Sequence, residues 1–280
     1  GALRCWGRGD LGQLGNGDEI TTDQPTASPV SQLTDAMSLS AGAYHTCAVR
    51  STGQVACWGA DANGQLGNGP LQGDWHTWGN VNGVTNATAV AAGGYHTCAL
   101  LATGRVKCWG ANSHGQCGTG GAVDAVPLEP TDVFNVEDAV AVAAGTGSTC
   151  ALRGNGQVLC FGADDSGQLG NGSAVVGDQS IPSVVTGLFD AVAISAGGSH
   201  ACAIRAGGLV VCWGNDEYGQ VGNGPGLVAN SVSPSPLVGI LAASVSVGYR
   251  HTCAVSLAGD TLCWGYDVEG ALGNGPTITD

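Results

Sequence analysis

Cysteine is the residue type whose spacing in this sequence implies a definite chemistry. If Ser51–Gly53 is a hairpin turn, Cys47 and Cys57 lie directly opposite each other, with Cα atoms about 4.5–5.5 Å apart, which a disulfide tolerates. The same ten-position spacing predicts five disulfides, each within one hairpin, and so an oxidising compartment: secreted, periplasmic or at the cell surface. The pairs are Cys47 and Cys57, Cys98 and Cys108, Cys150 and Cys160, Cys202 and Cys212, and Cys253 and Cys263.

Zinc binding and buried free thiols are the other roles open to these cysteines. Zinc sites usually draw on closer Cys-x2-4-Cys pairs, although a histidine stands two residues before the first cysteine of four pairs as a third candidate ligand. These histidines are His45, His96, His200 and His251. Because each occupies the same place in a repeated pattern, we expect it to make a structural hydrogen bond within its own unit.

Two cysteines stand outside the pairs. Cys5 is expected to bond to a cysteine on a strand upstream of Gly1. Cys117 replaces a leucine in a repeated Gly-Gln-Leu-Gly string, so we expect a small buried side chain there.

Acidic residues follow the repeated Cys-Trp-Gly strings and raise the question of a metal or catalytic site. In a turn, Asp or Asn bonds its own backbone two residues on, which is the expected role of the equivalent residues Asp61, Asn112, Asp164, Asp216 and Asp267. Calcium stays an alternative, but no Asp-x-Asp-x-Asp-Gly loop is present. No two carboxylates stand out as the pair of a glycoside hydrolase. The sequence therefore predicts no catalytic residue and no cofactor.

The overall charge excludes one class of partner. The chain has 280 residues, with 22 Asp and Glu against 8 Lys and Arg, and a formal net charge of −14. A protein that binds DNA through its phosphates needs a basic face that releases counterions. No apolar run reaches the roughly 18 residues that a membrane helix needs. We therefore expect an acidic protein that neither binds nucleic acid nor inserts into a membrane.

The elements that must position the cysteines repeat along the chain. The first cysteines of successive pairs are 51 or 52 residues apart, and His-Thr-Cys and Cys-Trp-Gly strings recur with them. Each unit consists of a small alternating strand, a hairpin closed by glycine, and a proline-marked fourth segment. No stretch has a sustained helical period. Four antiparallel strands in about 52 residues indicate an all-β fold, a β-propeller of four-stranded blades.

These strings resemble the repeats of the regulator of chromosome condensation (RCC1-type) family. The resemblance is carried by the His-Thr-Cys-Ala-Val string at 45–49, by Cys-Trp-Gly at 57–59 and by Gly-Gln-Leu-Gly-Asn-Gly at 64–69. It implies a propeller, typically of about seven blades, and does not determine the function. The disulfides and the acidity suit a secreted, bacterial-type member better than the chromatin-bound nucleotide-exchange role known in the family.

All units are expected to form one propeller domain with five complete blades and an N-terminal half blade. The first unit lacks the lead-in and His-Thr-Cys strands. A fragment of a longer protein is the favoured explanation, because an open sheet edge promotes aggregation; a neighbouring chain that supplies the missing strands is the alternative. The expected boundaries are a partial blade at 1–36 and blades at 37–87, 88–139, 140–191, 192–242 and 243–280.

Divergent loops are the expected binding surface, because rigid blades with variable loops are typical of a propeller's binding face. One loop holds Asp74, Trp75, His76 and Trp78, whose aromatic rings suit a protein hot spot or a sugar platform. The alternative is that Trp75 and Trp78 only cover the edge of a blade. The divergent segments are Asp18–Asp23, Pro70–Thr77, Gly121–Val126, Ser173–Gln179 and Pro225–Ser231.

Three functions follow from this sequence. The first is a non-catalytic scaffold, secreted or at the cell surface, that binds protein partners through its inter-blade loops. The second is a segment of an extracellular adhesin or fibre, assembled by strand complementation of the half blade. The third is a carbohydrate-binding propeller or an enzyme.

Overall fold

Strands are the only regular elements in the part of the chain that the computed structural model describes. That part comprises residues 1–17, 22–70, 73–121, 123, 125–172, 177–224, 229–268 and 270–275. No helix within it is long and apolar enough to cross a membrane. The all-β class predicted from the missing helical period is confirmed.

The strands form antiparallel sheets in which chain neighbours pair with each other. A two-stranded sheet of β1 (Arg4–Gly7) and β2 (Gln24–Pro29) comes first, and three four-stranded sheets follow it. They contain β3 (Ala36–Ala41), β4 (His45–Arg50), β5 (Val55–Gly59) and β6 (Trp75–Asn80); β7 (Ala87–Ala92), β8 (His96–Leu101), β9 (Val106–Gly110) and β10 (Thr131–Asp132); and β11 (Ala139–Ala144), β12 (Ser148–Arg153), β13 (Val158–Gly162) and β14 (Gln179–Val184).

The last sheet differs from the predicted pattern, because two units merge in it. It contains six strands: β15 (Ala191–Ala196), β16 (His200–Arg205), β17 (Leu209–Gly214), β18 (Ser231–Val247), β19 (His251–Ser256) and β20 (Thr261–Gly265). The first part of β18 pairs with β17 and its last part with β19. The glycine that follows the fourth strand of another unit, Gly187 with φ +71, has its counterpart within β18 as Gly239 with φ +78, so the chain bends there between its two pairing partners.

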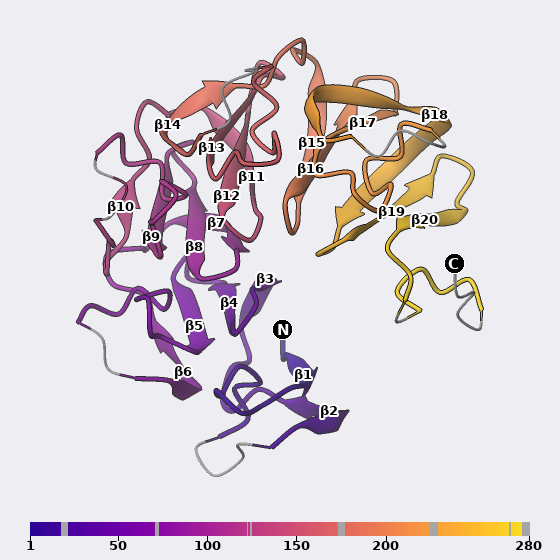
Figure 1. Cartoon of the computed structure of the whole chain (residues 1–280). Coiled ribbons are helices and arrows are strands. Elements are labelled where there is room, and N and C mark those ends of the chain that lie inside the picture. The colour runs from indigo at the N-terminus through magenta and orange to yellow at the C-terminus, as the bar shows by residue number, and fades with distance from the viewer. Residues whose placement is uncertain are drawn as a thin grey trace.

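The sheets follow one another in an arc, with the first strand of each on the inner side (Figure 1). These inner strands, β3, β7, β11 and β15, contact one another in turn, and β15 contacts β18. The sheet of β1 and β2 and the pair β19 and β20 lie at the two ends of the arc. This is how blades are arranged around a propeller axis; the number of complete blades and the closure of the ring stay predictions.

Each central hairpin carries its two cysteines at directly opposed positions. Gly53 has φ +80, a left-handed conformation that glycine adopts without strain, and it closes the turn that brings Cys47 opposite Cys57. The two sulfurs are bonded in all five pairs, with Cα atoms 4.0–4.1 Å apart. The ten-position spacing therefore corresponds to one disulfide per hairpin in the structure.

In several units an aromatic residue packs on the disulfide of the preceding unit. Trp109 on β9 is fully buried in one cluster with Cys47, Cys57 and Val55 of the neighbouring sheet. Gly67, with φ +65, lies under the indole, and a Cβ there would come within 2.6 Å of Trp109 Nε1. Phe161 and Trp213 occupy the equivalent sites of two further clusters, whereas Trp6 is 65% exposed.

Buried histidines also join neighbouring sheets. Thr97 Oγ1 donates its only proton to Gln65 O at 2.8 Å, so His45 Nε2, 2.8 Å from the same oxygen, must be the donor to it. The bonds His96 to Thr149 and His200 to Thr252 repeat this arrangement. The prediction of a bond within one unit is therefore wrong, because the acceptor belongs to the next unit. Burial lowers the pKa of the three histidines, to about 4 for His45 and His200 and about 3 for His96.

The disulfides should differ in their rate of reduction, because attack by a thiolate needs access to the sulfur. Cys253 and Cys263 are half-buried, whereas Cys202 and Cys212 in the adjacent hairpin are 0% exposed. We expect brief treatment of the folded protein with dithiothreitol to open the bond between Cys253 and Cys263 first. Pulse alkylation followed by mass spectrometry measures the order. Equal labelling of the two pairs would contradict this assignment of burial.

Candidate functional site

One end of the sheets gathers the features that suit binding. In an antiparallel meander, the turn between the first and second strands lies at the same end as the loop between the third and fourth. We call this the loop end; it includes the turns at 42–44, 93–95, 145–147, 197–199 and 248–250. The opposite end, with hairpins such as 51–54, is called the hairpin end. Every divergent segment identified in the sequence connects a third to a fourth strand along the chain, so its described flanks lie at the loop end.

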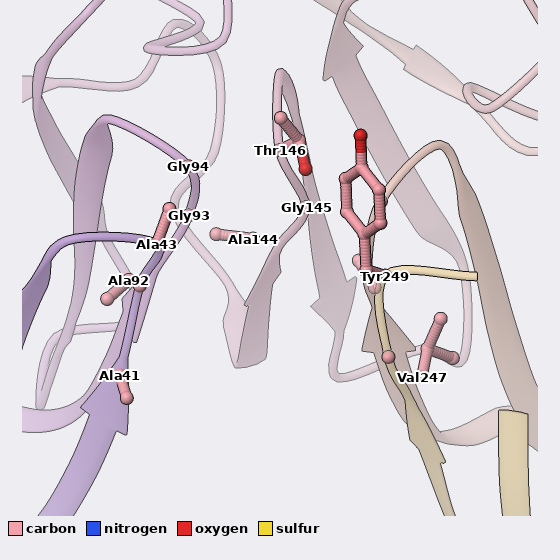
Figure 2. Close-up of a pocket in the computed structure, with 15 residues that line it drawn as sticks. Ala41, Ala43, Ala92, Gly93, Gly94, Ala144, Gly145, Thr146, Val247 and Tyr249 are labelled. Atoms are coloured by element: carbon pink, nitrogen blue, oxygen red, sulfur yellow. The ribbon is translucent and has the colours of Figure 1, made fainter. Parts of the chain in front are cut away.

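The loop-end turns line a cavity on the inner side of the arc. Its volume is about 270 Å³, and small residues of five units line it. Ala43 N donates to Gly93 O at 3.3 Å, Gly94 N to Gly145 O at 3.2 Å, and Gly198 N to Gly248 O at 3.1 Å, so backbone hydrogen bonds link the units around it. Tyr249 is the one large aromatic side chain at this cavity and stands across it from Ala43 and Gly94 (Figure 2).

All 5 tyrosines of the chain lie at the loop end. Tyr44 and Tyr95 follow the cavity-lining residues of their turns and stack on each other, with ring centroids 5.6 Å apart. Tyr218 and Tyr266 contact each other edge to face at 4.8 Å. Tyr249 is 66% exposed and Tyr95 is 40% exposed. This distribution was missed in the sequence, although the order of strands and turns already places all five at one end.

Arginine side chains lie over these tyrosine rings. The Arg250 guanidinium carbon is 5.2 Å from the ring centroid of Tyr218, 5.3 Å from Tyr249 and 5.5 Å from Tyr266. At the other end of the arc, Arg8 lies 5.3 Å from Tyr44 and pairs with Asp10. The rings therefore form surfaces that already hold guanidinium groups.

Four exposed carboxylates at the loop end have no lysine or arginine partner within the described residues. Asp23, Asp74, Asp165 and Glu217 are all exposed and appear in no ion pair there, while Asp178 pairs with His114 at 2.7 Å. At the hairpin end, arginines neutralise the repeated aspartates, in the pairs Arg50 with Asp35, Arg153 with Asp138 and Arg205 with Asp190. Glu137 and Asp260 at the hairpin end are also exposed and appear in no described ion pair, so the neutralisation at that end is limited to the repeated aspartates.

The repeated aspartates after Cys-Trp-Gly are buried and support their loops. Leu169 N donates to Asp164 Oδ1 at 3.0 Å, and Val221 N donates to Asp216 Oδ1 at 2.9 Å. The predicted bond to the backbone two residues on is wrong: the donor is five residues on, because the chain completes two successive turns around the carboxylate. Burial raises the pKa of both carboxyls. No group of three His, Cys, Asp or Glu in the described residues gathers as metal ligands would.

The predicted binding residues of the second divergent loop make contacts inside the protein. Trp78 Nε1 donates to Ser31 O at 2.9 Å, and Arg50 lies over its ring at 4.8 Å. The Trp75 ring folds over Gly79, and Asp74 Oδ1 accepts from Asp61 N at 3.2 Å. His76 lies against Gly12 of the first sheet. Together they join two sheets, and their role in binding stays a prediction.

Much of the divergent segments lies outside the described residues, at 18–21, 71–72, 122, 124, 173–176 and 225–228. The site is therefore built on the turns and loop bases that flank them. Of the two free cysteines, Cys117 is buried, as expected, and Cys5 is half-buried. Burial raises the pKa of both thiols, so neither is a reactive thiolate.

Known proteins share this repeat and this fold. A family model described as an RCC1-like domain matches residues 1–240. The ultraviolet-B receptor UVR8 of Arabidopsis thaliana is 31% identical over 285 residues, which cover 98% of this chain and 62% of the receptor. The chain spans 6% to 54% of the length of four other curated relatives that it matches.

Two solved structures have the same architecture. Human WBSCR16 superposes with a TM-score of 0.85 at 22% identity, over 96% of this chain and 73% of that chain. Prp20p from Saccharomyces cerevisiae superposes with a TM-score of 0.70 at 20% identity, over 99% of this chain and 83% of that chain.

Proposed function

Because the chain belongs to the RCC1-like domain family, we propose that it is a non-catalytic scaffold that binds protein partners through its loop end. The observation that carries this proposal is the gathering of all 5 tyrosines at that one end, where the described flanks of the divergent segments also lie. Tyrosine and arginine are enriched among the residues that dominate protein interfaces. The receptor UVR8 and the structural relative Prp20p, which was characterised for binding to Gsp1p and histones, support a role in binding proteins.

The proposal places the scaffold in an oxidising compartment, outside the cell or at its surface. Four of the five disulfides are fully enclosed by the cores between the sheets. Cytosolic thiol systems keep such pairs reduced, whereas secreted proteins retain them. A disulfide that closes a loop of about ten residues stabilises a fold by roughly 3 kcal/mol in the chain-entropy model. This stabilisation persists only where the environment does not reduce the disulfides, as outside the cell.

Site-directed photo-crosslinking tests the proposed function. A benzophenone amino acid is placed at Tyr95 of the loop end or at Asp260 of the hairpin end, since both are exposed. The folded variants are then irradiated in extracts of the organism that produces the protein. We expect discrete crosslinked proteins from the Tyr95 position and none from the Asp260 position. Equal crosslinking from both positions, or none from Tyr95, would count against a binding face at the loop end.

A further inference from the structure

We propose that the loop end recognises a basic protein segment, and that exposed tyrosine rings are the contacts for its arginine side chains. This inference rests on the proposed scaffold function and adds the chemistry of the partner. Its starting point is that the same end of the molecule carries every tyrosine, four exposed carboxylates without a described lysine or arginine partner, and the Arg–Tyr contacts.

The Arg–Tyr contacts show what these rings bind. Arg250 lies within 5.5 Å of three ring centroids, and Arg8 within 5.3 Å of Tyr44. A guanidinium stacks on aromatic rings better than other cations, because it is planar and weakly hydrated. Tyr249 and Tyr95 keep a large exposed surface beyond these contacts. Their outer faces therefore offer a second guanidinium the environment that Arg250 and Arg8 already occupy.

The charge distribution selects the same partner. Asp23, Asp74, Asp165 and Glu217 are exposed at the loop end without a lysine or arginine partner among the described residues. At the hairpin end, Arg50, Arg153 and Arg205 neutralise the repeated aspartates. Glu137 and Asp260 are exposed there without such a partner, but they lie away from the tyrosines. In a chain of net charge −14, the four loop-end carboxylates attract a basic segment to the tyrosine-bearing end and repel an acidic one.

A sugar is the main competing occupant, since it also stacks on aromatic rings. Binding of an uncharged oligosaccharide would not depend on salt or on Glu217, whereas binding of an arginine-bearing segment depends on both. The dependence on charge therefore separates the two occupants.

Calorimetric titration with short peptides tests the inference. The probe is acetyl-Gly-Arg-Gly-Arg-Gly-Arg-amide, with lysine and glutamate versions and a neutral glucan hexasaccharide as comparisons. We expect the arginine peptide to bind most tightly, the lysine peptide more weakly, and neither the glutamate peptide nor the hexasaccharide to bind. Exposed cation–π contacts contribute about 0.5–1 kcal/mol each, so the double variant Tyr95→Leu with Tyr249→Leu should bind the arginine peptide about tenfold more weakly.

Matched variants separate stacking from general attraction. Replacement of Tyr249→Phe keeps the ring and should leave the affinity within about twofold. Glu217→Gln at the loop end should weaken binding by about threefold, and Asp260→Asn at the hairpin end should leave it unchanged. All these side chains are exposed, so the tryptophan fluorescence of the folded protein should be retained.

Three results would overturn the inference: equal binding of the glutamate peptide or the hexasaccharide, an unchanged affinity in the double leucine variant, or an equal loss in Asp260→Asn. If crosslinking from Tyr95 still captures a protein while the arginine peptide does not bind, the scaffold function stands and the basic partner is refuted. If neither occurs, both are refuted.

Discussion

Acidification from pH 7.5 to pH 5 should lower the free energy of unfolding by about 2 kcal/mol for each of three buried histidines. Burial lowers the pKa of His45 and His200 to about 4 and that of His96 to about 3, whereas an unfolded histidine titrates near 6.5. Below pH 6.5 these histidines become protonated in the unfolded chain but stay neutral in the folded chain. Their contribution to the free energy of unfolding is therefore fully present above pH 6.5 and is lost as the pH falls toward 4. The three sites together predict a loss of about 6 kcal/mol by pH 5.

Denaturant unfolding at a series of pH values, followed by tryptophan fluorescence, measures this loss. His96→Gln keeps a donor for Thr149 but cannot be protonated, so the change of stability with pH should shrink by about one third. The carboxyls of Asp164 and Asp216, whose pKa burial raises, act in the opposite direction and are unchanged in this comparison. The proposed hydrogen bonds between sheets would be contradicted if the free energy of unfolding did not vary between pH 7.5 and pH 5. They would also be contradicted if His96→Gln left the dependence of this free energy on pH unchanged.

Trp109→Ala should destabilise the protein by about 3–5 kcal/mol, the usual range for removing a fully buried aromatic side chain. Trp109 is 0% exposed and packs on the disulfide between Cys47 and Cys57. Its indole N–H donates to Gln65 O at 2.9 Å, but Thr97 Oγ1 donates to the same oxygen. The loss is therefore mainly a cavity between two sheets.

Two matched variants check the origin of this loss. Trp109→Phe reproduces the unit that naturally has Phe161, and should cost only about 1 kcal/mol for the missing hydrogen bond and ring area. Trp264→Ala should cost less than Trp109→Ala, because Trp264 is only half-buried. The free energies come from chemical denaturation at pH 7.5. If Trp109→Ala had the same free energy of unfolding as Trp109→Phe, packing between the sheets would not be the main source of the stabilisation by Trp109.

The hairpins and their disulfides could be predicted from the sequence, because they depend on local geometry. A glycine turn at Gly53 and two cysteines ten positions apart allow one antiparallel register, and the structure has that register. The RCC1-like domain and the four-stranded antiparallel sheets were predicted from the same repeat and are confirmed. The boundaries proposed for the units stay predictions.

Contacts between units could not be predicted in the same way. His45 bonds to Thr97, 52 positions away, and the partner depends on how sheets stack rather than on spacing along one strand. The continuous strand β18 was also not predicted, because a pattern averaged over the repeats hides how one particular unit connects to the next. The hydrogen bond that each loop aspartate accepts from the backbone N–H five residues on likewise depends on two successive turns, which form only in the folded loop.

The candidate site was predicted only in part. The loop end could be derived from the order of strands. Its tyrosines could be predicted as well, because each lies in or directly after a connection that the strand order places at that end. Trp75 and Trp78 were predicted as binding residues because they lie close together in a string rich in aromatic residues. Their side chains instead contact Gly79, Ser31 and Arg50 within the protein. Residue type alone does not distinguish an aromatic residue that joins sheets from one that meets a partner.

A peptide map of the native, non-reduced protein tests the account most directly, because adjacent second and third strands are what place the binding turns and loops at one end. We predict that each of the ten paired cysteines is linked to the one ten positions away and that Cys117 is recovered as a thiol. Linkages between cysteines of different units, or ten free thiols in protein purified from its native compartment, would contradict both the strand order and the oxidising environment.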